Sequence, residues 1–141
     1  MKKVGYLVDT SALARLLRDP AVRREWRWRV AEGALAVCPL TELEIMGSAQ
    51  SRADARAIQS LLDESYRWVL MPDGIFDRAR EVQDGLMDRG THRSAGSIDL
   101  LVAATAKAHG LTLLHYDRDF VQVADVTGQK VQWLAEPGSI N

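Results

Sequence analysis

The chain has 141 residues, of which 47% are apolar and 26% charged, so it suits one domain with its own hydrophobic core and not a disordered chain. Its single cysteine, Cys38, excludes an internal disulfide and a cysteine-based zinc site and fits a reducing cytosol. A net charge of −1 argues against a general nucleic-acid binder, and no stretch approaches the roughly 20 apolar residues of a membrane span, so we expect a cytoplasmic protein.

Apolar spacing and helix-start signals predict strands that alternate with helices along the whole chain. The expected strands are 4–8, 35–38, a very short 69–70, 112–116 and 131–134. The expected helices are 11–18, 20–32, 39–49, 52–68, 72–90, 98–108 and 118–124. This alternation indicates the α/β class, with a mostly parallel sheet that carries helices on both faces.

Three details of these elements are specific enough to test. Helix 52–68 is indicated by apolar residues that fall near helical spacing: Ala53, Ala57, Leu61, Leu62 and Trp68. Ser97 is the expected N-cap of the helix that starts at Ile98, and Pro72-Asp73 should open the preceding helix. We expect one domain over residues 1–135 and a frayed tail over 136–141.

Four carboxylates stand where an apolar segment meets a turn or a helix start. Asp9 and Asp117 each come just after an expected buried strand, where α/β folds keep their ligand sites. Glu44 and Asp99 open helical runs. Acidic residues that converge repel one another unless a cation lies between them, and Mg²⁺ prefers oxygen ligands. The sequence therefore predicts a small metal-dependent enzyme.

Asp99 and Asp9 differ in how strongly they indicate such a site. Asp99 lies in the first turn of an almost wholly apolar helix, so its burial is costly without a cation or a ring of donors. Asp9 is followed by Thr10 and Ser11. This tripeptide fits a ligand site and equally fits a helix cap made by Asp9 or Ser11.

Two acidic pairs leave a choice of residue. Glu42 and Glu44 are two positions apart on a helix, so only one of them can face a common site. Asp117 is closer to the strand end than Asp119, so we favour Asp117 as the ligand. Asp119 either assists through water or caps the next helix.

Positive charge is concentrated near the start of the chain. Residues 1–32 hold eight basic and four acidic residues, a net charge of +4, whereas the remainder has a net charge of −5. A basic region beside an acidic centre suits an enzyme that acts on a polyanion through a metal. The alternative is a solvated helix face on which Arg and Glu pair.

Four segments in this order resemble the PIN-domain ribonucleases of the VapC toxin type. They are VDTSAL (8–13), CPLTELEIMGSA (38–49), SIDLLVAA (97–104) and LHYDRDF (114–120). The resemblance covers essentially the whole chain. It implies a three-layer α/β/α sandwich and Mg²⁺-dependent or Mn²⁺-dependent endonucleolytic cleavage of RNA.

The same resemblance assigns roles to residues. It makes Asp9, Glu44, Asp99 and Asp117 the catalytic acids, with Asp9, Asp99 and Asp117 as metal ligands. Thr10 or Ser11 corresponds to the hydroxyl that steadies the metal site. The family's glutamate usually precedes a small residue four positions on, here Ser48, but a glycine is common there and Gly47 stands one residue earlier, so Glu42 stays a lesser candidate.

The resemblance also implies partners and a physiological role. It implies a homodimer and a cognate VapB-type antitoxin that inserts a segment, often with an Arg, across the acidic site, and a toxin that inhibits translation. Arg23, Arg24 and Arg27 are candidates for contact with the RNA backbone, or else for acids at a dimer or antitoxin interface. The alternative function is a weak or inactive nuclease that mainly binds an antitoxin and helps it repress transcription.

Overall fold

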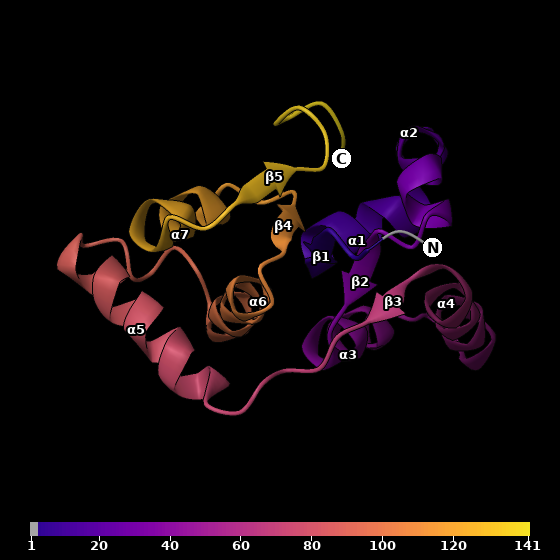
Figure 1. Ribbon diagram of the computed structural model, residues 1–141. Coiled ribbons are helices and arrows are strands. Elements are labelled where there is room, and N and C mark those ends of the chain that lie inside the picture. Colours follow the sequence, from indigo (N-terminus) through magenta and orange to yellow (C-terminus); the bar gives the residue numbers. More distant parts are fainter. Residues whose placement is uncertain (1–2) are drawn as a thin grey trace.

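The structure is a computed structural model and describes residues 3–141. Five strands in these residues form one sheet in the order β3-β2-β1-β4-β5, and every neighbouring pair is parallel (Figure 1). The strands are β1 (Tyr6–Val8), β2 (Leu35–Val37), β3 (Arg67–Trp68), β4 (Thr112–His115) and β5 (Val131–Trp133). The helices are α1 (Thr10–Arg18), α2 (Pro20–Ala31), α3 (Pro39–Gly47), α4 (Arg52–Ser65), α5 (Ile75–Asp88), α6 (Ser97–Ala108) and α7 (Asp119–Thr127).

The strand order creates a switch point between β1 and β4. From the central β1 the chain builds β2 and β3 on one side, then crosses over to build β4 and β5 on the other. Val8 is paired with Leu114, and the Asp9 N–H donates to the Leu114 carbonyl at 2.9 Å. In open parallel sheets ligands bind in the crevice at the carboxyl ends of strands that flank such a point.

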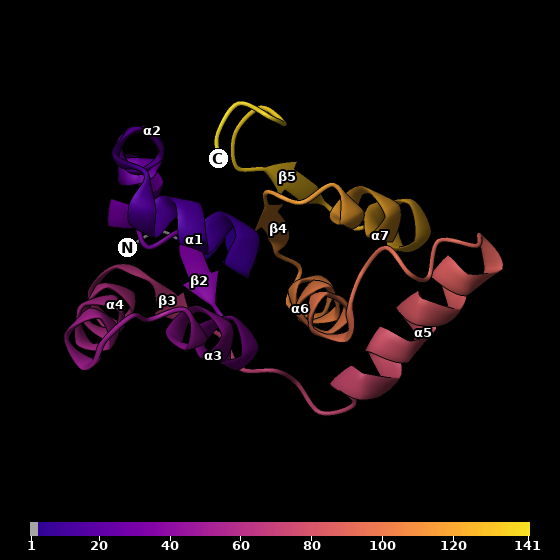
Figure 2. The same cartoon turned by 180° about the vertical axis from the view of Figure 1, so that it is seen from behind.

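Alternate residues of each strand face two separate cores. Leu7 of β1 and Leu113 of β4 pack with α5, α6 and α7 in one core. The adjacent Val8 and Leu114 pack with α1 and α2 in the other. Because successive strand side chains point to opposite faces, each face of the sheet is covered by its own helices (Figure 1, Figure 2). The expected three-layer α/β/α sandwich is confirmed.

Helix α6 is the most deeply buried helix of the domain. Residues 100–106 are buried without interruption, including Thr105, whose hydroxyl donates to the Leu101 carbonyl at 2.8 Å. A helix that is apolar all round must be enclosed by other elements. This enclosure explains the apolar sequence that follows Asp99. It also fixes the orientation of α6, whose first turn carries Asp99.

The sequence-based bounds were wrong at β3 and α4. The short strand is Arg67–Trp68 rather than 69–70, and α4 ends at Ser65, so Trp68 is not helical. Of the apolar residues near helical spacing, Leu62 is the one that α4 buries. Apolar side chains on α4 line open cavities, so their spacing did not mark the core.

Two helix starts also differ from expectation. The N-cap of α6 is Gly96 rather than Ser97, and its N–H donates to the Asp99 side chain at 3.2 Å. Helix α5 starts at Ile75 rather than at Pro72-Asp73, because Gly74 has φ of +76° and interrupts the right-handed turn.

The last residues of the chain contact its first helices. Trp26 of α2 donates its indole N–H to the Leu134 carbonyl at 3.0 Å, and the Ile140 N–H donates to the Tyr116 hydroxyl at 3.0 Å. Ile140 is partly buried against the core that contains α1 and α2. These contacts do not test whether residues 136–141 fray, so fraying of this tail stays a prediction.

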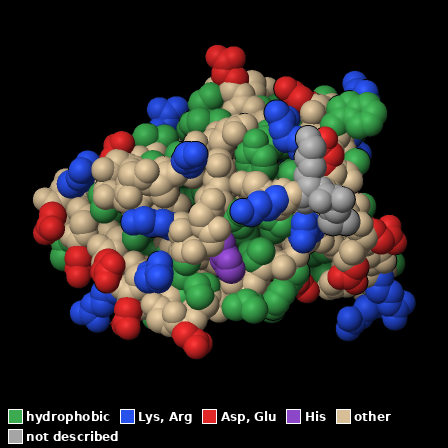
Figure 3. Space-filling model, viewed as in Figure 1, with side chains coloured by type: hydrophobic (Ala, Val, Ile, Leu, Met, Phe, Trp, Pro, Cys, Tyr) green, Lys and Arg blue, Asp and Glu red, His purple; other side chains and the backbone are tan. Residues whose placement is uncertain are grey.

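The surface shows no continuous area of one charge on the face seen in Figure 3, where basic and acidic side chains are interspersed with other residues. Within residues 3–141, no helix has the length and apolar character needed to cross a membrane.

Candidate active site

Asp9 uses its two carboxylate oxygens in different ways. It follows β1 with extended backbone angles and is the N-cap of α1. Its Oδ2 accepts from the Ser11 backbone N–H at 3.0 Å and from the Ser11 hydroxyl at 2.7 Å. Its Oδ1 is buried and has no hydrogen-bond partner, and the residue is only 3% exposed. One oxygen therefore caps the helix, while the other is left for a ligand.

Ser11 links the two strands at the switch point. Its hydroxyl donates to Asp9 and accepts from the Tyr116 N–H, just past β4, at 2.9 Å. The hydroxyl expected near the metal site therefore fixes the Asp9 carboxylate relative to the end of β4.

Glu44 is brought to the same place by α3. The Thr10 hydroxyl, at the start of α1, donates to the Glu44 Oε1 at 2.6 Å. Glu44 is also one of the charges that raise the pKa of Asp9. Because two residues two positions apart on a helix point in different directions, Glu42 cannot share this orientation.

The charges of the three other carboxylates all act on the pKa of Asp99. Burial is the main cause that raises its pKa to about 6, and the negative charges of Asp9, Asp117 and Glu44 act in the same direction, whereas the hydrogen bond from the Gly96 N–H opposes them. The pKa of Asp9 is likewise raised, chiefly by burial and then by Glu44, against the lowering effect of its bonds with Ser11. The fold thus places Asp9, Glu44 and Asp117 within electrostatic reach of Asp99, and Glu44 within reach of Asp9.

Asp117 and Asp119 divide the roles that the sequence left open. The Asp117 Oδ1 accepts from the Asp119 N–H at 2.9 Å, which fixes the turn from β4 into α7. Asp119 is the first residue of α7, and its pKa is raised by burial and then by Asp117. Asp117, not Asp119, is among the charges that act on Asp99.

His115 has a contact with the site that the sequence did not reveal. It is fully buried at the end of β4, and burial lowers its pKa to about 4 against the opposing charge of Asp117. Its Nδ1 accepts from the Asp117 backbone N–H at 3.2 Å. His115 was not singled out from the sequence, and the one sequence signal for this role is its position two residues before Asp117.

The residues fit a hard divalent cation, although the protein does not form a closed cage. Among the described residues, no three His, Cys, Asp or Glu side chains are grouped closely enough to hold an ion by themselves. Mg²⁺ usually keeps several waters and is bound through one or two carboxylates plus substrate phosphates. The unpartnered Asp9 Oδ1, in a residue on which the charge of Glu44 acts, matches that mode of binding.

The three candidate RNA-binding arginines lie on α2. Arg23 donates to the Leu17 carbonyl at 2.6 Å, and the Arg27 guanidinium lies over the Trp28 ring at 5.2 Å. An apolar cavity of about 340 Å³ lies between α1, α2 and α4 and is lined by Leu16, Leu17, Arg23, Arg27, Val30, Ala31, Leu61, Ser65 and Tyr66. None of the four carboxylates lines this cavity, so the structure does not group these arginines with the acidic site.

A second cavity adjoins the first. It has a volume of about 600 Å³ between α1 and the α3–α4 region, and it shares Leu17 and Leu61 with its neighbour. The two cavities together are here called the α1–α4 groove. Apolar side chains line both of them, with Arg23 and Arg27 in the first and Arg18 and Asp54 in the second.

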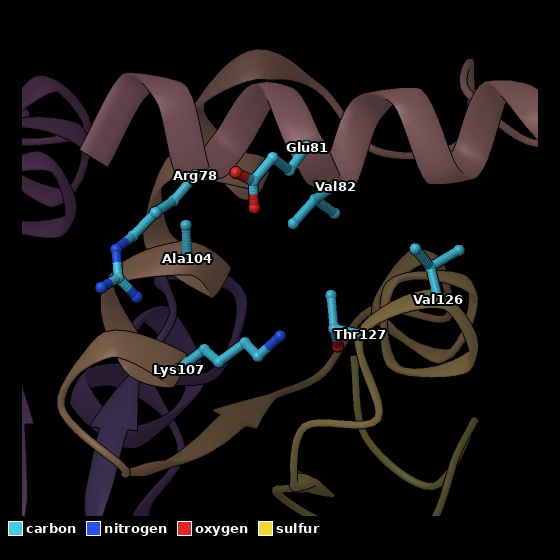
Figure 4. A pocket seen from close by; sticks show the side chains of 7 residues that line it. All are labelled: Arg78, Glu81, Val82, Ala104, Lys107, Val126 and Thr127. Carbon is cyan, nitrogen blue, oxygen red and sulfur yellow. The ribbon is translucent and has the colours of Figure 1, made fainter. Parts of the chain in front are cut away.

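A smaller pocket of about 230 Å³ lies between α5, α6 and α7. Figure 4 shows Arg78 and Glu81 reaching into it from α5 and Lys107 from α6. These long side chains are exposed, and none of the four site carboxylates lines the pocket. The acidic chemistry therefore belongs to the carboxyl edge of the sheet and not to this pocket.

The chain is similar to several known proteins. The PIN domain family model matches residues 6–126. Ribonuclease VapC21 of Mycobacterium tuberculosis strain H37Rv is 41% identical over 134 residues, which cover 95% of this chain and 96% of the relative. Ribonuclease VapC51 of the same strain is 38% identical over 136 residues, which cover 96% of this chain and 97% of the relative.

Solved structures show the same fold. DNA-bound VapBC from Salmonella typhimurium matches with a TM-score of 0.76 at 16% identity, covering 94% of this chain and 100% of the other. VapBC-1 from nontypeable Haemophilus influenzae matches with a TM-score of 0.72 at 20% identity, covering 92% of this chain and 97% of the other.

Proposed function

The chain belongs to the PIN-domain family and, within it, to the VapC ribonucleases, and from this premise we propose that it is a divalent-cation-dependent endoribonuclease. The observation that carries the proposal is the buried Asp9 Oδ1, which has no hydrogen-bond partner, in a residue whose pKa is raised by burial and by the charge of Glu44 and which itself raises the pKa of Asp99. A buried anionic oxygen without a partner is costly unless a cation offsets it.

Each acid has a role in this proposal. Asp9, Asp99 and Asp117 hold the cation, directly or through its waters, and Ser11 keeps the Asp9 carboxylate in place. Thr10 orients Glu44 toward the same space. One of the four carboxylates accepts the proton of the attacking water. A bound Mg²⁺ or Mn²⁺ supplies a Lewis acid toward a phosphate oxygen and makes water a stronger nucleophile.

The test is RNA cleavage by the purified chain. We expect new 5′ ends in cellular RNA when Mg²⁺ or Mn²⁺ is present, and none in chelator. A control variant is Asp84→Asn, which removes an exposed carboxylate of α5 outside the site and should cut RNA like the wild type. Cleavage that is equally fast in chelator would contradict the proposal, and mapping the new ends identifies the RNA that is cut.

The proposed physiological role is that of the toxin of a toxin-antitoxin pair. The relatives are named VapC ribonucleases, and the solved structures of the same fold are VapBC complexes. We propose that this chain cleaves cellular RNA in the cytoplasm, inhibits translation and is held by a VapB-type antitoxin. The α1–α4 groove offers that partner an apolar surface separate from the four carboxylates.

We also propose that the chain forms a homodimer. Phe76 is 73% exposed and Leu43 is 70% exposed, and large apolar side chains this exposed suit a protein contact. The expected result is a dimer in light scattering that Phe76→Ser weakens.

The second candidate function is a weak nuclease that mainly binds an antitoxin and helps it repress transcription. The α1–α4 groove favours it, because partner binding there needs none of the four carboxylates. Full repression together with no cleavage of RNA by the wild-type chain in Mg²⁺ or Mn²⁺ would support this function over RNA cleavage.

A further inference from the structure

Three side chains hold the backbone that leads from β4 into α7. The Ser11 hydroxyl accepts from the Tyr116 N–H at 2.9 Å, and the Asp117 carboxylate accepts from the Asp119 N–H at 2.9 Å. Between these two bonds, the His115 Nδ1 accepts from the Asp117 N–H at 3.2 Å. The segment that presents Asp117 therefore has a side-chain partner at three of its backbone N–H groups.

The His115 ring packs against two aromatic rings. It is fully buried, with its centroid 5.2 Å from that of Phe120 and 4.8 Å from that of Trp133. Because these rings pack on the imidazole, its Nδ1 cannot turn away from Asp117 without displacing the aromatic residues. The hydrogen bond is thus made by an acceptor of fixed position.

The other ring nitrogen, Nε2, shows that the imidazole is retained for its Nδ1 bond and not for its fit alone. A ring that accepts at Nδ1 carries its proton at Nε2, and this buried Nε2 has no hydrogen-bond partner. A phenyl ring would fill a similar space without that unsatisfied group. The bond to the Asp117 N–H is therefore the interaction that an apolar residue at this position could not make.

We propose that His115 is a positioning residue for the cation site, which acts by holding the Asp117 backbone so that the Asp117 carboxylate faces Asp9 and Asp99. This inference rests on the proposed function, because it concerns the same acidic site. His115 does not touch the substrate or the cation. It acts on a candidate ligand, and removal of a hydrogen bond that supports a ligand typically lowers metal affinity by about 10–100-fold.

The discriminating experiment compares two substitutions of the same residue. His115→Phe keeps an aromatic ring and removes the acceptor, whereas His115→Asn keeps an acceptor at a similar distance from the backbone. Trp133→Phe is the packing control, because it changes a neighbouring ring and leaves the Nδ1 bond. Mn²⁺ affinity is measured by calorimetry beside the melting temperature and the amide exchange of Asp117.

We expect His115→Phe to weaken Mn²⁺ binding by about tenfold or more and to speed exchange of the Asp117 amide. His115→Asn should restore both to near the wild-type level, and Trp133→Phe should change neither at a matched melting temperature. Unchanged Mn²⁺ affinity in His115→Phe would overturn the inference. So would an equal loss of affinity in His115→Asn.

A measurement on the unaltered protein covers the case in which His115→Phe does not fold. Long-range proton–nitrogen NMR spectra should show the His115 proton on Nε2 and Nδ1 as the acceptor, and the opposite tautomer would overturn the inference. If wild-type protein binds no Mn²⁺ and cuts no RNA, the proposed function fails, while the tautomer and amide exchange still decide whether His115 holds Asp117. If wild type does both and His115→Phe is unaffected, only the positioning inference fails.

Discussion

At the scale of single residues, Asp9 shows how one carboxylate serves both structure and function. The sequence left a helix cap and a ligand as equal alternatives. In the structure the Oδ2 caps α1 with the help of Ser11, while the Oδ1 is buried without a partner. The two interpretations are compatible because they concern different oxygens.

Asp99→Asn should abolish RNA cleavage without damage to the fold. The pKa of Asp99 is raised by burial and by three neighbouring carboxylates, so its negative charge opposes folding when no cation is present. We expect the variant in chelator to be as stable as wild type or more stable by about 1 kcal/mol, after allowance for solvent screening. Thermal melting in chelator beside an RNase assay checks both parts, and full activity of the variant would defeat the cation-site account.

The same pKa shift predicts how stability changes with pH. The folded-state pKa of Asp99, about 6, lies above its ordinary value of 3.8, so the folded protein binds this proton more tightly than the unfolded chain. Its stabilising contribution is fully present below pH 3.8 and is lost as the pH rises through about 6.

The measurement is the free energy of unfolding of wild type and Asp99→Asn in chelator, from about pH 4 to about pH 7. The difference between the two proteins isolates this group from other titrations. We expect wild type to lose stability relative to the variant as the pH rises, and added Mg²⁺ to reverse that loss near neutral pH. A constant difference across this range would show that Asp99 is not held in a repulsive environment.

At the scale of elements, α5 and α7 approach each other closely at one glycine. A Cβ atom added at Gly85 of α5 would meet the side chain of Val126 of α7. The two helices pack on the α6 side of the sheet, so this contact supports the layer that positions Asp99.

Gly85→Ala should therefore destabilise the domain by about 1–3 kcal/mol, in spite of the better helix propensity of alanine. Gly47→Ala is the matched control, since a Cβ there meets nothing within 4 Å and should be neutral or stabilising. Chemical denaturation of both variants and of Gly85→Ala with Val126→Ala gives the comparison. Rescue by the second substitution identifies the clash, and a neutral Gly85→Ala would show that α7 can shift away.

Strong local signals explain which elements the sequence predicted well. The apolar run after Asp99 predicted α6, and buried runs before Asp9 and Asp117 predicted β1 and β4. The sequence-based position of β3 was wrong, because Arg67 and Trp68 are both exposed at the sheet edge and show no alternation of buried and exposed side chains.

The candidate site was predictable as a set of acids but not as a set of contacts. The sequence singled out Asp9, which follows β1, and Asp99, which lies in the first turn of α6. It also singled out Glu44 as opening a helical run, which is wrong, because Glu44 lies in the second half of α3. It did not show that Thr10 bonds Glu44 or that His115 holds the Asp117 backbone, because these bonds depend on tertiary packing around each side chain.

At the scale of the whole molecule, the acidic site and the α1–α4 groove are separate surfaces. The four carboxylates lie at the carboxyl edge of the sheet, whereas the groove lies between helices and is lined by Leu17, Leu61 and arginines of α2. Binding of a partner in the groove could therefore be abolished while catalysis persists.

Substitutions in the groove should separate partner binding from RNA binding. We expect Leu61→Glu, or Arg23, Arg24 and Arg27 changed together to Gln, to weaken antitoxin binding, because Leu61, Arg23 and Arg27 line the apolar cavity. RNA affinity is measured in an Asp99→Asn background across several salt concentrations. Each phosphate of a single strand that the variant no longer neutralises would lower the log–log salt slope by about 0.7. An unchanged slope with weakened antitoxin binding is the expected result, and the reverse pattern would make these arginines part of the RNA-binding surface.

The most direct test of the central claim is an anomalous diffraction map from crystals soaked in Mn²⁺. The claim is that Asp9, Asp99 and Asp117 share a divalent cation and that the unpartnered Asp9 Oδ1 faces it. We predict an anomalous peak beside that oxygen and between the three carboxylates, absent from Asp99→Asn crystals soaked in the same way. A well-ordered acidic site with no peak, in a protein that cuts RNA in the presence of chelator, would contradict the account.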